Sequence, residues 1–561
     1  MNGVAVERGH QLLAANVTKS ANRISAARLA YLDGAASSGD FPLSNADTFV
    51  PGAEVEILAG ATNAPVTLFK GIVIRQGIKV RDHVAPQLIV ECRHKAVKLT
   101  VGHKNAYFFD QKDSDIISSL LQNAGLDADV ETTAVTHKQL VQYCCTDWDF
   151  LLMRAEANGK LIFTADDKVL VKAPVTDGSA VCSLLFGATI LEVDAQIDAR
   201  QQYSAVKSST WDAAQQSVVE KDAADPAIGT PGNLGAEDLA AVVGLDHFHL
   251  QHAAVAEAEA QAWADAQWLK SQLSRVNGRV KCEGIATVVP GDIVTLGGIG
   301  ERYNGDVFVS GVRHDFDLVQ GWKTHLQFGN LDTWLGKEQP VSAPKAAALL
   351  PGISGLQIGV VTGNEDPDAE HRVRVRLPLV DQQGDGTWAR IASLDAGEDR
   401  GFFFRPEIGD EVVLGFLNDD PRQAVILGML HSSAKPAPLQ GSDDNHEKLY
   451  QSRSKMKIYF NDDTKVMRLE TPAGNMITLN EDDKAVRIVD QNGNKLEMTQ
   501  DGIVMESSKA LTLKAGTELK LESGTSLNIK GGTELKLEGT SGAEVSSSGV
   551  TKVKGSLVQL N

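Results

Sequence analysis

The feature that most constrains the fold of this sequence is an eight-residue repeat between Ile503 and Val553. In seven consecutive units, two mainly apolar positions flank one residue that would point to the opposite side of a strand. Glycines lie between several pairs, where a residue without a Cβ permits a tight corner. The pairs are Ile503/Met505, Leu511/Leu513, Leu519/Leu521, Leu527/Ile529, Leu535/Leu537, Ala543/Val545 and Thr551/Val553. This spacing predicts a repeat fold built from short strands.

An eight-residue unit that buries two side chains has no core of its own. A single-chain β-solenoid needs roughly 18 to 25 residues for one closed coil, so three consecutive units of one chain could form a coil. Alternatively, three identical chains could each give one strand to every layer of an intertwined triangular prism. One chain would make only about two to three coils with open ends, whereas three chains would triple the layers and remove the free strand edges. The sequence therefore favours a homotrimer.

The prism has a predicted core and a predicted tip. We expect the shaft core to consist of Ile503, Met505, Leu511, Leu513, Leu519, Leu521, Leu527, Ile529, Leu535, Leu537, Val545 and Val553. The chain then ends on apolar side chains, which would form either the last layer or a flat platform that a separate cap covers. The predicted docking residues for a cap are Leu557, Val558, Gln559, Leu560 and Asn561.

Similar apolar pairs continue upstream of the strict repeat at a wider spacing, from Met456/Ile458 to Leu496/Met498. Turn-forming residues separate them, as at 481–483 and 490–494, and these suit wider loops between the same strands. We therefore expect the shaft to begin near residue 450 and to tighten toward the C-terminus.

Length and charge limit the function classes. A chain of 561 residues is long enough for about three to five domains. Its net charge of -19 argues against a nucleic-acid or anionic-membrane partner, because both are bound by clustered basic residues. The sequence has no apolar run of membrane-spanning length and no apolar core of a leader at its N-terminus. Its five scattered cysteines are typical of reduced residues in a protein made in the cytoplasm.

Residues 1–345 mix short strands with helices. Strands are predicted at 55–58, 67–73 and 87–92, and helices at 113–124, 147–158 and 253–276. Thr146 is a candidate cap for the second helix, and Gly278 is expected to end the third. Three histidines, His247, His249 and His252, lie near the predicted start of this third helix. They form either a metal site completed by other residues or an exposed cluster.

Residues 346–438 form a compact β segment after an Ala/Pro-rich linker. About five strands with Gly-Asp turns fit a small closed barrel of the OB type. Acidic residues such as Asp395, Glu398 and Asp399 surround it, so we expect it not to bind nucleic acid. Residues 439–561 follow as the predicted shaft and tip.

Three motifs in the barrel segment closely resemble the barrel of VgrG-like spike proteins of contractile injection systems. They are His371-Arg372-Val373-Arg374-Val375-Arg376, Phe402-Phe403-Phe404-Arg405-Pro406-Glu407-Ile408-Gly409-Asp410-Glu411-Val412 and Asp420-Pro421-Arg422-Gln423-Ala424-Val425-Ile426-Leu427-Gly428. Residues 1–345 resemble the phage-hub-like region of the same family. The matching residues are Pro51-Gly52, Phe69-Lys70-Gly71, Gln142-Tyr143, Asp147-Trp148-Asp149-Phe150, Pro290-Gly291-Asp292 and Tyr303-Asn304-Gly305.

This resemblance implies a mainly β fold with an α+β hub, an OB-fold barrel and a C-terminal trimeric β-helix. It also implies a homotrimer whose hub meets an inner tube protein and baseplate components and whose tip carries a PAAR-type cap. Effector cargo is a further partner in the family, and the target membrane is met only mechanically. Some related phage spikes bind a metal at their own tip through a His-x-His motif, but no histidine follows His446 here. A separate cap is therefore favoured.

The sequence lacks the motifs of an enzyme. It has no Gly-x-Ser-x-Gly elbow, no His-Glu-x-x-His and no phosphate-binding loop. Residues 439–450 leave no room for an enzyme between barrel and shaft. We therefore expect a spike without catalytic residues, cofactor or metal, which caps the inner tube and punctures a target envelope on sheath contraction. A trimeric tail fibre or adhesin and an envelope-degrading tail enzyme are the alternatives. An extracellular particle, a type VI secretion system and a phage are not distinguished.

Overall fold

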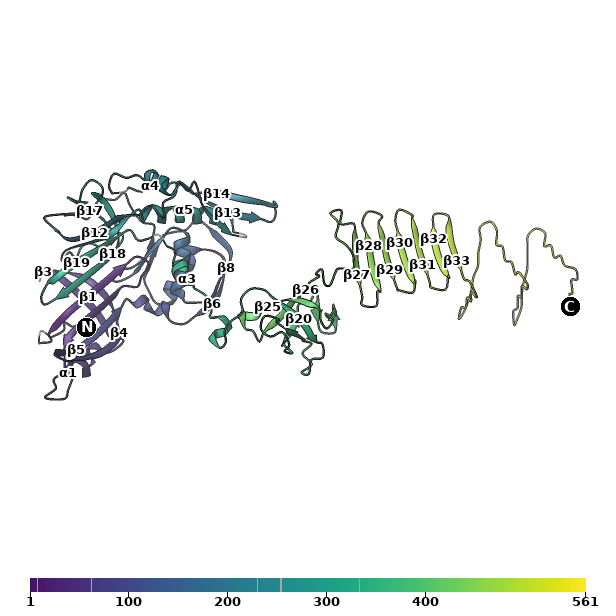
Figure 1. The fold of residues 1–561 in the computed structure, drawn as a ribbon, viewed down its shortest axis with the longest axis horizontal. Helices are drawn as coiled ribbons and strands as arrows, with labels where there is room; N and C mark the ends of the chain where they lie inside the picture. The colour runs from purple at the N-terminus through teal and green to yellow at the C-terminus, as the bar shows by residue number, and fades with distance from the viewer. Residues whose placement is uncertain (8, 62, 230, 253–254, 332, 561) are drawn as a thin grey trace. The chain divides into compact units, whose positions relative to one another are not determined.

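The computed structural model describes the chain except residues 8, 62, 230, 253–254, 332 and 561. Its contacts divide the chain into two compact units (Figure 1). The first unit comprises Met1–Ser354 with Phe416–Gln423, and the second comprises Gly355–Gly415 with Ala424–Asn561. The first unit contains the long helices and the largest sheet, and the second contains a small barrel and a C-terminal sheet.

An 11-stranded sheet forms the framework of the first unit, with the order β12-β16-β19-β18-β1-β2-β5-β4-β3 and with β11 and β17 attached through β18. Its strands are β1 (Leu12–Ser20), β2 (Ala26–Leu32), β3 (Glu54–Ala61), β4 (Ala64–Arg81), β5 (Val84–Arg93), β11 (Cys182–Leu185), β12 (Ile190–Ile197), β16 (Val276–Glu283), β17 (Ile293–Gly297), β18 (Gly305–Asp317) and β19 (Gly321–Phe328). The antiparallel pairing of β1 with β18 brings the two ends of this unit side by side. The predicted strands at 55–58, 67–73 and 87–92 are confirmed as parts of β3, β4 and β5.

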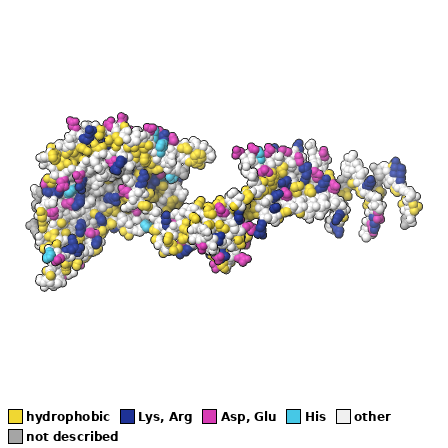
Figure 2. Space-filling view, viewed as in Figure 1, with side chains coloured by type: hydrophobic (Ala, Val, Ile, Leu, Met, Phe, Trp, Pro, Cys, Tyr) yellow, Lys and Arg dark blue, Asp and Glu magenta, His cyan; other side chains and the backbone are white. Residues whose placement is uncertain are grey.

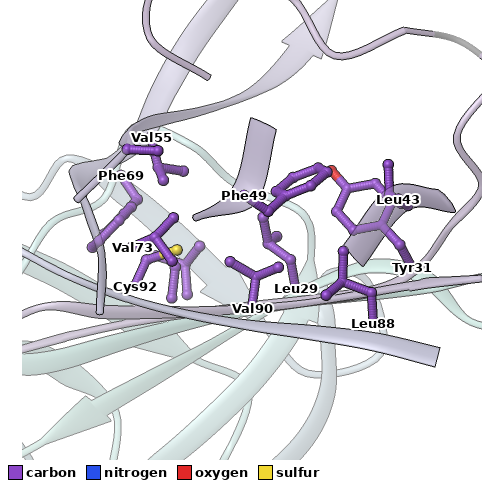
Figure 3. Close-up of a cluster of buried hydrophobic side chains, with 13 residues drawn as sticks. Leu29, Tyr31, Leu43, Phe49, Val55, Phe69, Val73, Leu88, Val90 and Cys92 are labelled. Carbon is purple, nitrogen blue, oxygen red and sulfur yellow. The ribbon is translucent and has the colours of Figure 1, made fainter. Parts of the chain in front are cut away.

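Two apolar clusters stabilise this sheet. The first, shown in Figure 3, surrounds Phe49 and Phe69, both fully buried, and includes Leu88 and Val90 of β5. The rings of Tyr31 and Phe49 lie 4.9 Å apart, centroid to centroid, and meet in this cluster. The second cluster gathers side chains of β16 to β19. Buried residues alternate with less buried ones along β2 and along the C-terminal part of β5, which explains why one face of the sheet becomes core.

Two helices and short strands pack beside the sheet. They are α2 (Asp113–Asn123), α3 (Asp147–Ala157), β6 (Lys104–Lys112), β7 (Ala128–Val130), β8 (Thr136–Cys145), β9 (Leu161–Thr164) and β10 (Val169–Lys172). Both predicted helices are confirmed. The Thr146 hydroxyl accepts a hydrogen bond from the Asp149 amide at 3.1 Å, which is the predicted N-cap.

The third predicted helix is only partly correct. The segment contains β13 (Val206–Asp212), β14 (Ser217–Asp222), α4 (Ala236–Val243), β15 (Phe248–His252) and α5 (Glu257–Leu273). The helix α5 ends at Leu273, and Gly278 lies inside strand β16 instead of at a helix end. A Cβ on Gly278 would lie 2.1 Å from the Asp194 carbonyl oxygen, so this glycine permits close strand packing. The predicted helix start, 253–254, lies outside the described residues.

Short elements complete the first unit. They are α1 (Pro42–Asn45), η1 (Asp47–Phe49), η2 (Lys95–Thr100), α6 (Leu335–Glu338), η3 (Lys345–Ala348) and η4 (Leu417–Asp419). Residues 289–292 form a turn, in which the Asp292 amide donates to the Val289 carbonyl and Gly291 has a φ of 101°. All five cysteines are free thiols; Cys92, Cys145 and Cys282 are buried, and the other two are half-buried.

The second unit begins with the predicted barrel. Its strands are β20 (Gln357–Gly363), β21 (Val373–Arg376), β22 (Thr387–Ile391), β25 (Glu411–Phe416) and β26 (Ala424–Met429), and they close in the order β20-β21-β22-β26-β25. A two-residue pair, β23 (Ala396–Gly397) and β24 (Arg400–Gly401), lies outside the barrel. Val373, Val375, Val412 and Leu414 alternate with partly buried neighbours and are fully buried in its interior. The mainly β fold class with a small barrel is therefore confirmed.

A seven-stranded antiparallel sheet follows the barrel. Its strands are β27 (Glu447–Gln451), β28 (Lys457–Asn461), β29 (Val466–Glu470), β30 (Met476–Asn480), β31 (Ala485–Val489), β32 (Lys495–Thr499) and β33 (Gly502–Glu506). Each strand pairs with the next strand of the same chain, side by side in Figure 1. This part of the predicted shaft is therefore a meander within one chain. In this part, successive layers do not each take one strand from every chain, as the predicted intertwined prism would require. Its turns are long enough to reverse the chain.

Candidate functional site

One face of the C-terminal sheet is apolar. Strand pairing places its side chains in two adjacent columns, because each apolar pair lies opposite the pair of the neighbouring strand. We call this surface the apolar face; it consists of Ile458, Phe460, Met467, Leu469, Ile477, Leu479, Val486, Ile488, Leu496, Met498, Ile503 and Met505. Figure 2 shows hydrophobic side chains gathered among charged ones over this sheet.

The apolar face is poorly buried in a single chain. Ile477 is 41% exposed, Leu479 45% and Ile503 70%, although large aliphatic side chains are among the residues most often buried in proteins. Complete burial of one such side chain contributes about 1.5–3 kcal/mol. A contiguous apolar surface of this kind is typical of an interaction site.

The opposite face of the same sheet has a polar central column. Tyr459, Arg468, Thr478, Arg487 and Glu497 lie opposite one another on successive strands. The Arg468 guanidinium lies 4.9 Å from the centre of the Tyr459 ring, and Arg487 donates to Glu497 at 2.8 Å. The pKa of Glu497 is held below its usual value, mainly by this hydrogen bond from Arg487. The sheet is thus amphipathic, with one face suited to water and one to a dry contact.

The apolar pairs continue beyond the sheet into residues 507–560. Leu511, Leu519, Leu527 and Leu535 are each 54–56% exposed. Within the described residues of this segment no strand is formed, so its units make no ladder with one another. A coil of three consecutive units from one chain, which the sequence allowed as an alternative, is therefore not observed. The backbone groups of the repeat are available to other chains.

The predicted shaft residues fall into two groups in the structure. Ile503 and Met505 belong to β33 and to the apolar face, opposite Met498 and Leu496 of β32. The remaining shaft residues are exposed and have no apolar partner surface within the chain. Among the predicted tip residues, Leu557 is 82% and Leu560 91% exposed. Gln559 and Val558 also lie in this extended end, and Asn561 is outside the described residues. Their role in docking stays a prediction.

Side-chain amides join the last turns of the meander to the first unit of the strict repeat. The Asp490 carboxylate accepts from the amides of Asn492 and Asn494, which with the Asn494 side chain lowers its pKa to about 2. The Asn494 side-chain oxygen, Oδ1, in turn accepts from the Ser508 amide at 3.1 Å and from the Ser507 hydroxyl at 2.8 Å. Sequence analysis assigned 490–494 to a turn but missed this link. The sequence feature that could have indicated this link is Asn494, the asparagine that ends the turn.

The histidine cluster is not at a helix start. His249 and His252 lie in strand β15, and the rings of His247 and His249 are 6.2 Å apart, centroid to centroid. In the described part of the chain, no three His, Cys, Asp or Glu side chains are grouped as metal ligands. No helix among the described residues has the length and apolarity needed to cross a membrane.

Comparison with protein families assigns the first unit. The model described as "Alg8 N-terminal domain" matches residues 1–317, more than half of the chain. The chain belongs to the Alg8 N-terminal domain family. A second model, the type VI secretion system/phage-baseplate injector OB domain, matches residues 357–431 of this Alg8-family chain, which include the five barrel strands.

Curated relatives of this Alg8-family chain include type VI secretion system spike proteins and a toxin. It is 29% identical over 157 residues to the type VI secretion system spike protein VgrG4b of Pseudomonas aeruginosa, which covers 27% of this chain and 17% of the relative. It is 31% identical over 134 residues to the actin cross-linking toxin VgrG1 of Vibrio cholerae, which covers 22% of this chain and 10% of the relative. The matches thus span about a sixth or less of each relative's length.

A solved structure covers more of the Alg8-family chain. The E. coli c3393 protein, described as a type VI secretion component similar to T4 tail proteins gp27 and gp5, covers 76% of this chain and 98% of its own, with 13% identity and a TM-score of 0.40. The resemblance to VgrG-like spike proteins is confirmed by the OB-domain match and the curated relatives. These matches support a spike or hub protein.

Proposed function

We propose that three copies of this chain form the spike of a contractile injection system. The hub of residues 1–345 caps the inner tube and meets the baseplate, the barrel surrounds the axis, and residues 439–561 form the shaft that punctures a target envelope on sheath contraction. The injector-type OB domain and the spike-type relatives support this assignment. The observation that carries it is the apolar face, which continues into a repeat without partners in its own chain.

Three copies account for the amphipathic pattern better than one. Apolar columns on three sheets can meet along one axis and exclude water, while the polar columns with Arg468 and Arg487 face outward. Each unpaired unit of 507–560 then finds hydrogen-bond partners in the neighbouring copies. The shaft is stiff in this arrangement, because every layer adds backbone hydrogen bonds around the same dry axis.

The proposed role is mechanical and without catalysis. The described residues group no metal ligands, and the spike-type relatives favour a structural role. The apolar end, with Leu557 and Leu560 exposed, suits a small PAAR-type cap protein. Effector cargo would travel on the hub or the cap. Synthesis in the cytoplasm and delivery within a contractile particle are part of the same proposal.

A charge in the dry axis tests this function. We expect Leu519→Asp or Leu535→Asp to abolish the shaft, because three carboxylates would be buried together without partners. The matched control is Thr512→Asp, which places the same charge at an outward position of the same repeat. Heat and detergent resistance of the purified protein, followed on gels, is the measurement. An unchanged resistant trimer for Leu519→Asp would contradict the proposal.

A further inference from the structure

Arg275 of the first unit is a buried cation with no counter-charge among the described residues. It lies between the end of α5 and the start of β16 and is 3% exposed. Its Nε and Nη2 atoms are buried and have no hydrogen-bond partner among the described residues. By contrast, Arg154 of α3 is paired with Asp113 at 2.6 Å and with Glu259 at 3.0 Å. The first unit thus pairs the Arg154 guanidinium with carboxylates, whereas the Arg275 guanidinium has no such counter-charge among the described residues.

An unpaired guanidinium is costly in such a place. Arginine keeps its proton at any physiological pH, so it cannot escape the cost of desolvation by becoming neutral. Burial lowers the pKa of Arg275, and no neighbouring carboxylate acts against this shift. Removal of a cation from water without a counter-charge costs several kcal/mol. A buried anion beside Arg275 would remove most of this cost.

A small cavity is present beside the residue. Its volume is about 30 Å³, and Arg275 lines it together with Thr176, Gly229, Gln272 and Phe308. A single water needs at least about 10–15 Å³ measured in this way, so the space admits one small ion and no larger ligand. Asp306 also lines the cavity, but its carboxylate accepts from the Thr295 hydroxyl at 2.5 Å and forms no ion pair with Arg275.

We propose that this cavity binds one small monovalent anion of the chloride class. The Arg275 guanidinium supplies the charge, and the Thr176 and Gln272 side chains supply polar atoms in the wall. The lining comes from the segment after β10, the linker that contains Gly229, the α5–β16 junction, and strands β17 and β18. The ion is therefore a structural ligand. It connects the segment after β10 and the linker that contains Gly229 to strands β17 and β18 of the main sheet. This site is independent of the proposed spike function.

Thermal unfolding of the full chain tests the site. We compare sodium chloride with sodium gluconate at equal ionic strength, because gluconate is too large for a 30 Å³ cavity. A ligand that binds only the folded state raises Tm, and we expect the transition of the first unit to be about 2 °C higher in chloride. Arg275→Met keeps the length of the side chain and should remove the difference. The control Arg279→Met, at an exposed position of β16, should keep it.

Two outcomes of this experiment would overturn the proposal: equal Tm values in both salts for the natural protein, or a chloride effect that persists in Arg275→Met. A second measurement needs no variant. Crystals of the full chain grown in sodium bromide should show an anomalous peak in the cavity within hydrogen-bond distance of the guanidinium. Bromide bound only elsewhere, with water alone in the cavity, would contradict the site even if Arg275→Met fails to fold.

Discussion

At the scale of single residues, the first unit buries several charges and satisfies them locally. Asp113, 1% exposed, accepts from His137 at 2.9 Å, from Nε and Nη2 of the Arg154 guanidinium and from Asn158 at 2.8 Å. Although burial alone would raise its pKa, the hydrogen bonds from His137 and Arg154 and the guanidinium charge hold it well below its usual range. The group links α2, β8 and α3 through one carboxylate.

Removal of this carboxylate should strongly lower the stability of the first unit. We expect Asp113→Ala to lower the free energy of unfolding of the first unit by about 3–5 kcal/mol, because Arg154 loses its main counter-charge while buried. The control is Asp129→Ala, where the carboxylate is exposed and lies 3.6 Å from Lys168, and the expected cost is below about 1 kcal/mol. Urea unfolding followed by tryptophan fluorescence gives both values. Similar losses for both variants would contradict the assigned role of Asp113.

Two buried histidines predict acid sensitivity. Desolvation is the main reason that the pKa values of His94 and His314 are lowered to about 4, and the nearby Lys19 charge adds to the effect in each. Asp166 and Asp315 act in the opposite direction. The unfolded chain binds protons near pH 6.5, before the folded chain does, so stability is complete above that pH and falls as the pH drops toward 4. We expect the Tm of the first unit to decrease across this window.

The variant His314→Gln tests the cause of this decrease. It keeps a polar side chain near the Thr324 hydroxyl, which lies 3.0 Å from His314 Nδ1, but it cannot take up a proton. The slope of Tm against pH between 6.5 and 4 should become shallower than in the natural protein. An identical slope would assign the acid sensitivity to other groups.

At the scale of elements, local signals in the sequence predicted helices well and strand partners poorly. Thr146 and the acidic residues after it identified α3 because capping is a contact between near neighbours. Gly278 was misassigned because its role depends on Asp194, a residue of another strand. Strand β15, which holds His249 and His252 just before α5, was missed for the same reason, since it exists through its parallel pairing with β13.

The two faces of the C-terminal sheet allow a matched test. Ile477 and Thr478 are adjacent in β30, but Ile477 belongs to the apolar face and Thr478 to the polar column. We expect Ile477→Asp to prevent association or to lower the stability of the assembly strongly, and Thr478→Asp to be tolerated. Analytical ultracentrifugation of both variants gives the oligomeric state. Trimers of equal stability would show that the apolar face is not the contact surface.

The amide of Asn494 should fix the start of the strict repeat. Asn494→Ala leaves the Ser508 amide and the Ser507 hydroxyl without their acceptor, at a cost of about 1–3 kcal/mol per chain. We expect protease cleavage after β33 to become faster while the meander persists. Asn492→Ala is the control, because its side chain contacts only Asp490 within the turn. Equal cleavage rates in the two variants would contradict the link.

At the scale of the whole molecule, the sequence predicted the repeat and the barrel but not the main topology. Periodicity in residues 503–553 predicts which side chains point together, and the structure places Ile503 and Met505 on the apolar face, while the common core of the later units stays a prediction. The pairing of β1 with β18 joins residues such as Asn16 and Asp315, which are 299 positions apart. No local pattern encodes such a partner, because it is selected by packing of the completed sheet.

The central claim is that three chains share one shaft, and the mass in solution tests it most directly. We would measure the full chain by light scattering beside a form that ends before residue 450, which lacks the shaft. The full chain should have a mass near three times 60.0 kDa, and the shortened form should lose mass or detergent resistance. A full-length monomer would contradict the account, because the apolar face and the repeat would then be stable without partners.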